Sequence, residues 1–222
     1  MTRKDKKISK NIIFFLFSIF FLIGLLTFRD YGMWGDETFQ RFSGFYWLNY
    51  VLSFTSFDEL KDITALKIDQ IIDFTIQNPK YYPYYGVIFD LPAAFLELIF
   101  QIEDSKNYFY LRHFLNFTFF FIGSIFFYKL LLNRFSNYNV SLIGTLFFVL
   151  SPRIYGNSFY NNKDVVFLSL ITIALYCCFK ALEKPSNKNL LIFSIFAAIA
   201  PSSRVVGIFL PLSFIGFYFL SV

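Results

Sequence analysis

The stretch "NIIFFLFSIFFLIGLLTF", residues 11–28, is almost purely apolar and is long enough to cross a bilayer as a single helix. The rest of the chain has the same character: 56% of its 222 residues are hydrophobic, and its mean hydropathy is +0.54. A soluble domain of this length does not need so much apolar surface. The composition therefore predicts an all-α, multi-pass membrane protein.

A cleaved signal peptide is the competing interpretation of this first run. The run is longer than the apolar region of a usual signal peptide. It is followed by "RDYGMW", residues 29–34, where a signal peptide would have small residues for cleavage. We therefore expect a first span that stays in the protein.

Five further apolar runs predict more spans, which gives about six transmembrane helices. They cover about 110–132, 140–150, 165–182, 190–200 and 205–222. The runs at 140–150 and 190–200 are short, and each borders a segment with proline and arginine. Such ends are typical of helices that line a cavity enclosed by protein.

Basic residues predict the orientation. Five of the 20 basic residues lie in the first ten positions. If the N-terminus is cytoplasmic, the inside segments 1–10, about 129–139 and about 180–189 hold ten basic against two acidic side chains. This bias follows the positive-inside rule, and the same clustering argues against a nucleic-acid partner. We expect an integral protein of a bacterial inner or plasma membrane, with an extracytoplasmic active face.

The longest connection, residues 29–109, is then a large extracytoplasmic loop. From 34 to 52 aromatic residues recur at helical spacing, which predicts a helix lying in the membrane interface. A more polar amphipathic stretch follows at 58–77, and 87–102 is again apolar. The cysteines, Cys177 and Cys178, are adjacent within an apolar run, so no disulfide framework is expected.

Two carboxylates, Asp36 and Glu37, follow the first span directly. One interpretation is local: Asp36 caps the interfacial helix and Glu37 pairs with Arg41 four residues on. The other is catalytic: a positioned carboxylate takes the proton of a weakly nucleophilic hydroxyl acceptor, and its neighbour organises a metal or phosphate. Position along the chain does not decide between them.

Cationic side chains gather on the same expected face of the membrane. They are Arg112, Arg153, Lys163 and Arg204. A guanidinium fork matches phosphate oxygens, so these residues suit a lipid phosphate. The local alternatives are snorkelling of Arg112 to the interface, contact of Lys163 with headgroups, and capping of the fourth span by Asp164. We expect His113 to be a satisfied interfacial side chain.

Four segments of the chain occur in a recognisable order: "GDETFQRF" at 35–42, "YYPYYGVIFDLPAA" at 81–94, "LRHFLNFTFFFIGS" at 111–124 and "SPRIYGNSFYNNKDVVFLSL" at 151–170. In this order they resemble the N-terminal part of GT-C-class integral-membrane glycosyltransferases. The nearest resemblance is to the dolichyl-phosphate-mannose protein mannosyltransferases and to the bacterial aminoarabinose transferases that act on lipid A.

The resemblance implies roles for particular residues. Asp36 would be the catalytic base, Glu37 would assist it or bind a metal, and Asp164 would belong to the site as a second metal-ligand candidate. Donor phosphate would contact Arg112 and, on a weaker match, Arg153, Lys163 and Arg204. A divalent metal ion is the one cofactor considered.

The resemblance also implies a fold and partners. Residues 1–222 would be one GT-C-like transmembrane domain, the N-terminal portion of a longer fold, with interfacial helices in the loop 29–109. The donor would be a polyprenyl- or dolichyl-phosphate sugar in membrane lipid, and the acceptor a glycan, lipid or protein hydroxyl. The segment "YPYYG" at 82–86 departs from the His-Pro-Pro pattern of the eukaryotic protein mannosyltransferases, which argues against a protein acceptor. The length predicts a truncated or split enzyme.

Two other functions compete with glycosyl transfer. A lipid or glycolipid transporter subunit would need polar residues at mid-bilayer along a path. The ionisable residues here gather instead at one face, which favours a surface active site. A non-catalytic assembly partner that keeps the shell of an enzyme fold is the other alternative.

Overall fold

The computed structural model describes residues 3–75 and 87–221, and these residues form helices and no strand. The all-α prediction is confirmed for this part of the chain. The elements are α1 (Arg3–Thr27), α2 (Glu37–Leu52), α3 (Asp58–Thr75), α4 (Val87–Ile99), α5 (Ser105–Phe135), α6 (Tyr138–Val149), α7 (Pro152–Tyr160), α8 (Asp164–Glu183), α9 (Asn187–Ser203), the short 3-10 helix η2 (Val205–Ile208) and α10 (Phe209–Ser221).

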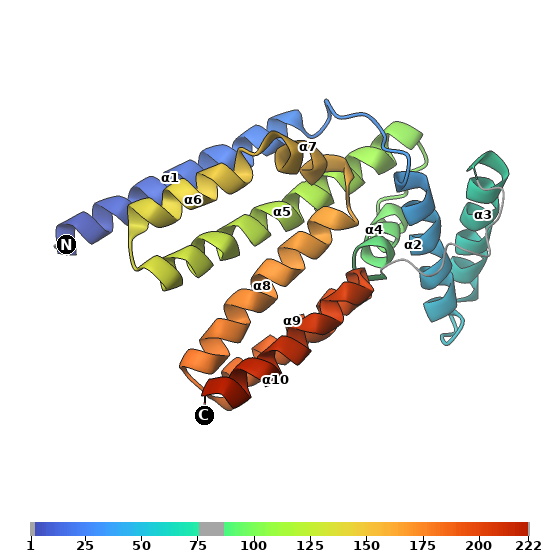
Figure 1. Ribbon diagram of the computed structural model, residues 1–222. Coiled ribbons are helices and arrows are strands. Elements are labelled where there is room, and N and C mark those ends of the chain that lie inside the picture. The colour runs from blue at the N-terminus through green and yellow to red at the C-terminus, as the bar shows by residue number, and fades with distance from the viewer. Residues whose placement is uncertain (1–2, 76–86, 222) are drawn as a thin grey trace.

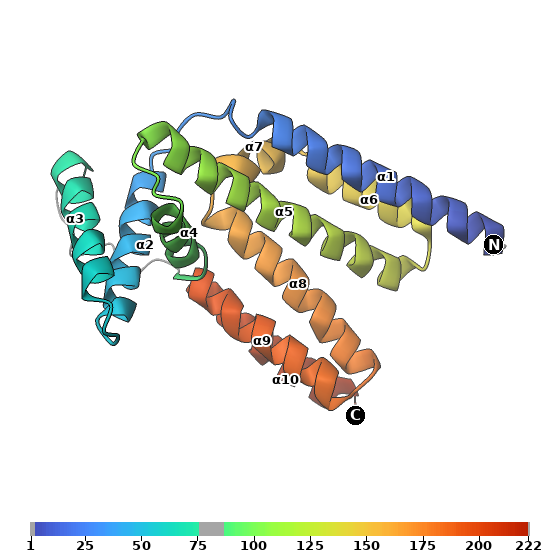
Figure 2. The same ribbon diagram turned by 180° about the vertical axis from the view of Figure 1, so that it is seen from behind.

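The helices form two groups (Figure 1). Helices α1, α5, α6, α8, α9 and α10 run roughly side by side (Figure 1). Helix α2 packs between α3 and α4 beside the end where α1 finishes and α5 starts, and both views show this arrangement (Figure 2). The short helix α7 lies at this same end. The segment between the first two predicted spans therefore builds its own helical layer over one end of the bundle.

Two helices, α5 and α8, are long and apolar enough to cross a membrane. Shorter apolar helices cover Asn11–Thr27, Tyr138–Val149 and Val205–Phe219. Helix α6 has 12 residues, and at about 1.5 Å per residue it is shorter than a hydrocarbon core of about 30 Å. The structure thus supports two spans by length and composition, and the total of about six stays a prediction.

Capping residues delimit the long helices. Asp104 starts α5 by accepting the N–H of Asn107 at 3.2 Å, and Ser136 ends it in the left-handed conformation with φ of 50°. Asn137 then accepts the N–H of Asn139 at 2.9 Å and starts α6 at once. This short turn reverses the chain, so α6 runs back along α5 (Figure 1).

The connection between the predicted spans at 140–150 and 165–182 is not a simple loop, because most of it is helix α7. Pro152 stands in the first turn of α7, where its fixed φ suits a helix and its missing N–H costs no hydrogen bond. Phe159 of α7 is fully buried and stacks on Phe117 of α5, with 5.1 Å between ring centroids. Packing against α5 therefore stabilises a helix in a segment whose polar residues suggested a loop.

A close backbone approach joins α2 to α4. A Cβ atom at Gly44 of α2 would lie 2.3 Å from the carbonyl oxygen of Asp90 in α4. Only glycine allows this distance, because real Cβ contacts are longer and the obstacle is backbone. The contact joins the middle of α2 to the first turn of α4, and both helices carry buried charged residues.

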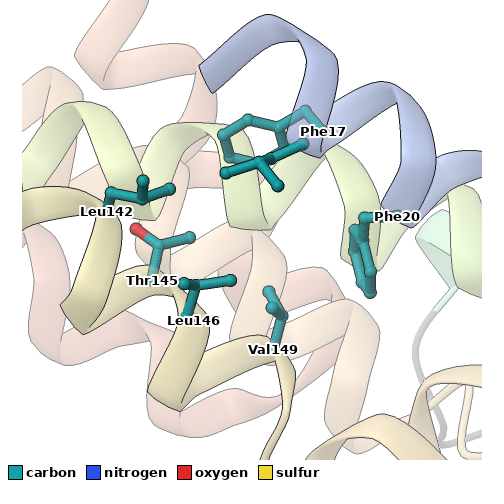
Figure 3. Close-up of a pocket in the computed structure, with 7 residues that line it drawn as sticks. Phe17, Phe20, Leu142, Thr145, Leu146 and Val149 are labelled. Atoms are coloured by element: carbon teal, nitrogen blue, oxygen red, sulfur yellow. The ribbon is translucent and has the colours of Figure 1, made fainter. Parts of the chain in front are cut away.

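The pocket between α1 and α6 is small and apolar (Figure 3). It encloses about 30 Å³ and is lined mainly by leucine and phenylalanine side chains, together with Val149 and Thr145. The Thr145 hydroxyl donates to the carbonyl of Ser141 in its own helix at 2.8 Å. This pocket offers no free polar group, so it is not a candidate for chemistry.

Candidate functional site

Five polar side chains are buried where the α2–α4 layer meets the bundle. We call them the polar strip: Glu37 of α2, Asp90 of α4, Arg112 and His113 of α5, and Asn162 just before α8. Each is at most 5% exposed. Burying charged groups is costly unless they are paired, so the contacts among them decide what the site can do.

Glu37 contacts His113 across the boundary between α2 and α5. The His113 Nε2 atom lies 3.0 Å from Glu37 Oε1, and the backbone N–H of Trp34 donates to Glu37 Oε2 at 2.7 Å. The other ring nitrogen, Nδ1, lies 3.3 Å from the carbonyl oxygen of Phe28. The His113 ring is 1% exposed, so it is enclosed between these contacts, and its expected place at the membrane interface stays a prediction.

Arg41 does not pair with Glu37, so that local prediction is wrong. Its Nε and Nη2 donate to Glu97 Oε1 of α4 at 3.0 and 2.5 Å. Its guanidinium also lies over the ring of Tyr108 in α5, 3.8 Å from the centroid. Glu37 and Arg41 thus each lie against a buried partner from another helix, His113 and Glu97, instead of pairing along α2.

Arg112 binds Asp90 rather than snorkelling to the interface. Its Nη1 lies 3.3 Å from Asp90 Oδ1, and the same oxygen accepts the amide of Asn162 at 3.1 Å. Arg112 is 1% exposed, which contradicts the local alternative. Its Nε and Nη2 atoms are buried and have no hydrogen-bond partner among the described residues. Two donors of this buried cation are thus left without a hydrogen bond in the described part of the chain.

Burial raises the pKa of Asp90 from 3.8 to about 7, against the opposing effect of Arg112. Asp90 lies in α4, outside the two candidate spans. The folded protein therefore holds this proton more tightly than the unfolded chain. The resulting stability is fully present below about pH 4 and is lost as the pH rises to about 7.

Asp90→Asn should therefore gain stability relative to the wild type as the pH rises from about 5 to about 7, by at most about 1.4 kcal/mol per pH unit. The amide oxygen still accepts from Arg112 and Asn162 but carries no charge. Thermal unfolding in detergent at a series of pH values measures the difference. Asp69→Asn, at an exposed position of α3, is the control. A difference that does not change with pH would contradict the raised pKa.

Asp36 precedes α2 with its side chain exposed. It occupies the N-cap position, but its backbone has φ of −84° and ψ of −13° and its side chain makes no capping hydrogen bond. The usual N-cap has an extended backbone, which lets the side chain reach back to the helix. The predicted cap is therefore wrong for the side chain, and the carboxylate of Asp36 remains accessible.

A second polar group lies at the junction of α7, α8 and α9. Arg153, Asn157, Asn161 and Asp164 line part of a cavity of about 190 Å³. Arg204 forms an ion pair with Asp164 from the end of α9. Asn161 accepts the backbone N–H of Asp164 at 3.0 Å and so caps α8. Asp164 itself is the first residue of α8, not its cap.

The structure brings most of the predicted site residues to one end of the molecule. Lys163 holds the N-cap position of α8 and is half-buried. It follows Asn162 of the polar strip directly, so the strip and the α7–α8–α9 group are continuous along the chain. Asp36 and Glu37 join this region through the Glu37–His113 contact.

A metal site receives little support from these side chains. Within 3–75 and 87–221, no group of three or more His, Cys, Asp or Glu side chains could hold a metal ion. The oxygens of Glu37 face His113 and Trp34, and those of Asp164 face Arg204 and Asn161. Carboxylate oxygens that already face cationic and N–H groups do not fit a metal ion, so the reaction proposed below assigns no role to one.

Two buried acids of α4 were not predicted as functional. Asp90 and Glu97 are seven residues apart and therefore share one face of the helix. Two acids on one face of an apolar helix need buried cationic partners, which is the signal that could have found Arg112 and Arg41. Asn162 carried no comparable signal, because its role depends on the position of Asp90.

Residues 91–222 match the family described as dolichyl-phosphate-mannose-protein mannosyltransferase. The chain belongs to this family. The match covers more than half of the chain and includes Arg112 and Asp164, whereas Asp36 lies outside it. Neither a curated protein nor a solved structure matches the chain. Membership of the mannosyltransferase family makes the protein a membrane-associated glycosyltransferase of the GT-C type, with a lipid-linked sugar donor in general terms.

Proposed function

We propose that the protein transfers a sugar from a polyprenyl- or dolichyl-phosphate donor to a hydroxyl of an extracytoplasmic acceptor. One observation carries this proposal. Glu37 and His113 are in contact at 3.0 Å. Asp36, an exposed carboxylate, is the chain neighbour of Glu37, and Arg112, with two unpartnered donors among the described residues, is the chain neighbour of His113. A base and a phosphate binder are the two groups that this reaction requires.

The chemistry assigned to these residues is a single displacement. The acceptor oxygen forms a bond to the anomeric carbon of the sugar while the bond from that carbon to the donor phosphate oxygen breaks. Asp36 takes the proton of the acceptor hydroxyl, and the electron pair of the broken bond leaves with the lipid phosphate. Arg112 stabilises the negative charge that develops on this phosphate, because its donors lie in a buried setting where charge is weakly screened.

The α7–α8–α9 group is proposed as a second contact for the donor. Arg153 lines the polar cavity with Asp164, and Arg204 pairs with that carboxylate. Lys163 lies beside them at the start of α8. A lipid phosphate sugar carries both negative charge and hydroxyl groups, which suit cations and amide side chains respectively.

The membrane setting of the proposal follows the basic N-terminus. We infer a multi-pass protein with a cytoplasmic N-terminus and the polar strip on the extracytoplasmic side. The N-terminus of α1 lies at the end of the bundle opposite the α2–α4 layer, which supports this orientation (Figure 1). The acceptor is a glycan, lipid or protein hydroxyl on that side.

Arg112→Lys tests the donor site. Lysine keeps a positive charge near Asp90 but loses the guanidinium fork. Losing hydrogen bonds to a charged phosphate costs about 1.5–3 kcal/mol. The value of kcat/KM for the donor should therefore fall roughly 10- to 100-fold. The measurement is sugar transfer from a synthetic polyprenyl-phosphate sugar by the full chain in proteoliposomes.

Arg134→Lys, at the exposed far end of α5, is the matched control and should transfer at the wild-type rate. An Arg112→Lys enzyme with unchanged donor KM and kcat would remove Arg112 from the donor site. A folded wild-type chain that transfers no sugar from any polyprenyl-phosphate donor would favour a non-catalytic assembly partner.

A further inference from the structure

Both oxygens of the Glu37 carboxylate lie against protein atoms, and Oε2 is the one that makes a hydrogen bond within the described residues. Its Oε1 faces His113 Nε2 at 3.0 Å, and its Oε2 accepts the Trp34 N–H at 2.7 Å. Glu37 is 0% exposed and His113 is 1% exposed. With one oxygen bound to the backbone of Trp34 and the other lying against the His113 ring, Glu37 is placed to hold this segment rather than to take a proton from an acceptor.

His113 holds both ends of the segment that carries Asp36. Its Nδ1 lies 3.3 Å from the carbonyl of Phe28, the residue that follows α1, and its Nε2 lies against Glu37, the first residue of α2. Residues 29–36 connect these two points. One imidazole of α5 therefore contacts the chain just before and just after this segment.

Ring stacking fixes the middle of the same segment against α7. Tyr31 stacks on Phe159 with 4.2 Å between centroids, and Trp34 stacks on Tyr160 at 5.5 Å. Asp36 follows two residues after Trp34 and remains exposed. The segment is thus held by α5 at its ends and by α7 in its middle, while the carboxylate itself is left accessible.

We propose that His113 and Glu37 are positioning residues, which hold Asp36 in register with Arg112 and do not touch the reactants. The inference rests on the proposed function, in which Asp36 acts on the acceptor and Arg112 on the donor phosphate. We call the contacts of His113 with Phe28 and Glu37 the clamp. Because His113 and Arg112 are neighbours on α5, the clamp fixes the position of Asp36 relative to Arg112. Misplacing a reacting group by about 1 Å costs about 10²-fold in rate, so such a clamp has a large effect.

Three variants of the full chain separate positioning from direct catalysis. Glu37→Gln keeps an oxygen for Trp34 N–H and an amide facing His113, so kcat should stay within about threefold of the wild type, less than one ordinary hydrogen bond is worth. His113→Leu removes the clamp and should lower kcat by about 10²-fold with donor KM unchanged. Thr118→Val is the control, because that hydroxyl bonds the Phe114 carbonyl within α5 at 2.8 Å.

Trp34 fluorescence gives a readout that does not depend on activity. The chain has two tryptophans, so Trp47→Phe leaves Trp34 as the one emitter. In that background His113→Leu should shift Trp34 emission to longer wavelength as the stack on Tyr160 is lost, whereas Glu37→Gln should not. The shift would be seen even if the chain transferred no sugar, so failure of the proposed function is distinguishable from failure of the clamp.

Two results would overturn the proposal. One is His113→Leu with unchanged kcat and unchanged Trp34 emission. The other is Glu37→Gln with kcat lowered about 10²-fold and unchanged emission, which would mean that Glu37 acts on the reactants. If His113→Leu does not fold, the Glu37→Gln variant alone decides, since retained kcat supports positioning and a lost kcat with normal emission contradicts it.

Discussion

Asp36→Asn is expected to lower the rate of sugar transfer by about 10²- to 10⁴-fold, the usual contribution of a positioned general base. Asparagine has the same shape but cannot take the acceptor proton. The exposed side chain of Asp36 makes no capping hydrogen bond, so the substitution removes no contact that stabilises α2. The loss should therefore lie in kcat, with little change in donor KM or in thermal stability.

Transfer from a polyprenyl-phosphate sugar, measured in proteoliposomes, checks this expectation. Asp30→Asn is the matched control, because Asp30 is an exposed carboxylate in the same connecting segment and should be replaceable without loss. Asp36→Glu should retain part of the activity, since a carboxylate is still present. A folded Asp36→Asn protein that transfers sugar at the wild-type rate would exclude Asp36 as the base.

Glu97→Ala is expected to destabilise the protein by about 3–5 kcal/mol, because it leaves a buried guanidinium without its counter-charge. Arg41 and Glu97 are 7% and 1% exposed, and their bidentate contact joins α2 to α4. Arg41 also lies over Tyr108, so the same loss loosens the start of α5. Unfolding in detergent, followed by circular dichroism against temperature or denaturant, measures the change.

Replacing both partners should cost far less than replacing one. In Arg41→Met/Glu97→Leu no charge remains buried, and apolar pairs of similar volume are often neutral at such positions. Glu183→Ala is the surface control: its carboxylate accepts the Asn133 amide at 2.7 Å in an exposed contact, and its loss should cost under about 0.5 kcal/mol. Equal destabilisation by the single and double replacements would show that the pair contributes through packing rather than charge.

The helical character and most helix positions were predictable from the sequence. Apolar runs are local signals, and the structure places α5 and α8 over the runs at 110–132 and 165–182 with ends only a few residues away. The helix at 34–52 starts later, at Glu37, and α4 stops at Ile99 rather than 102. Helix α7 was missed, because its stability comes from burying Phe159 against α5 and not from its own composition.

The site was predicted in part. The sequence marked Asp36, Arg112 and Asp164 as candidates. The structure places the starts of α2, α5 and α8, where these residues lie, at one end of the bundle. The ion pair predicted between Glu37 and Arg41 was wrong, because it was inferred from spacing along one helix. Glu37 and Arg41 each bind a residue from another helix, His113 and Glu97, which lie 76 and 56 positions away in the chain.

The sequence determined that this chain is helical, that it is apolar enough for a membrane, and which ionisable residues are available for chemistry. These properties depend on composition and short-range order. Only the tertiary structure decided which carboxylate is accessible and which is enclosed, since Asp36 and Glu37 are neighbours in the chain. Asp36 is exposed and Glu37 is buried because consecutive residues at a helix start point in different directions, and only the direction of Glu37 meets His113 of α5.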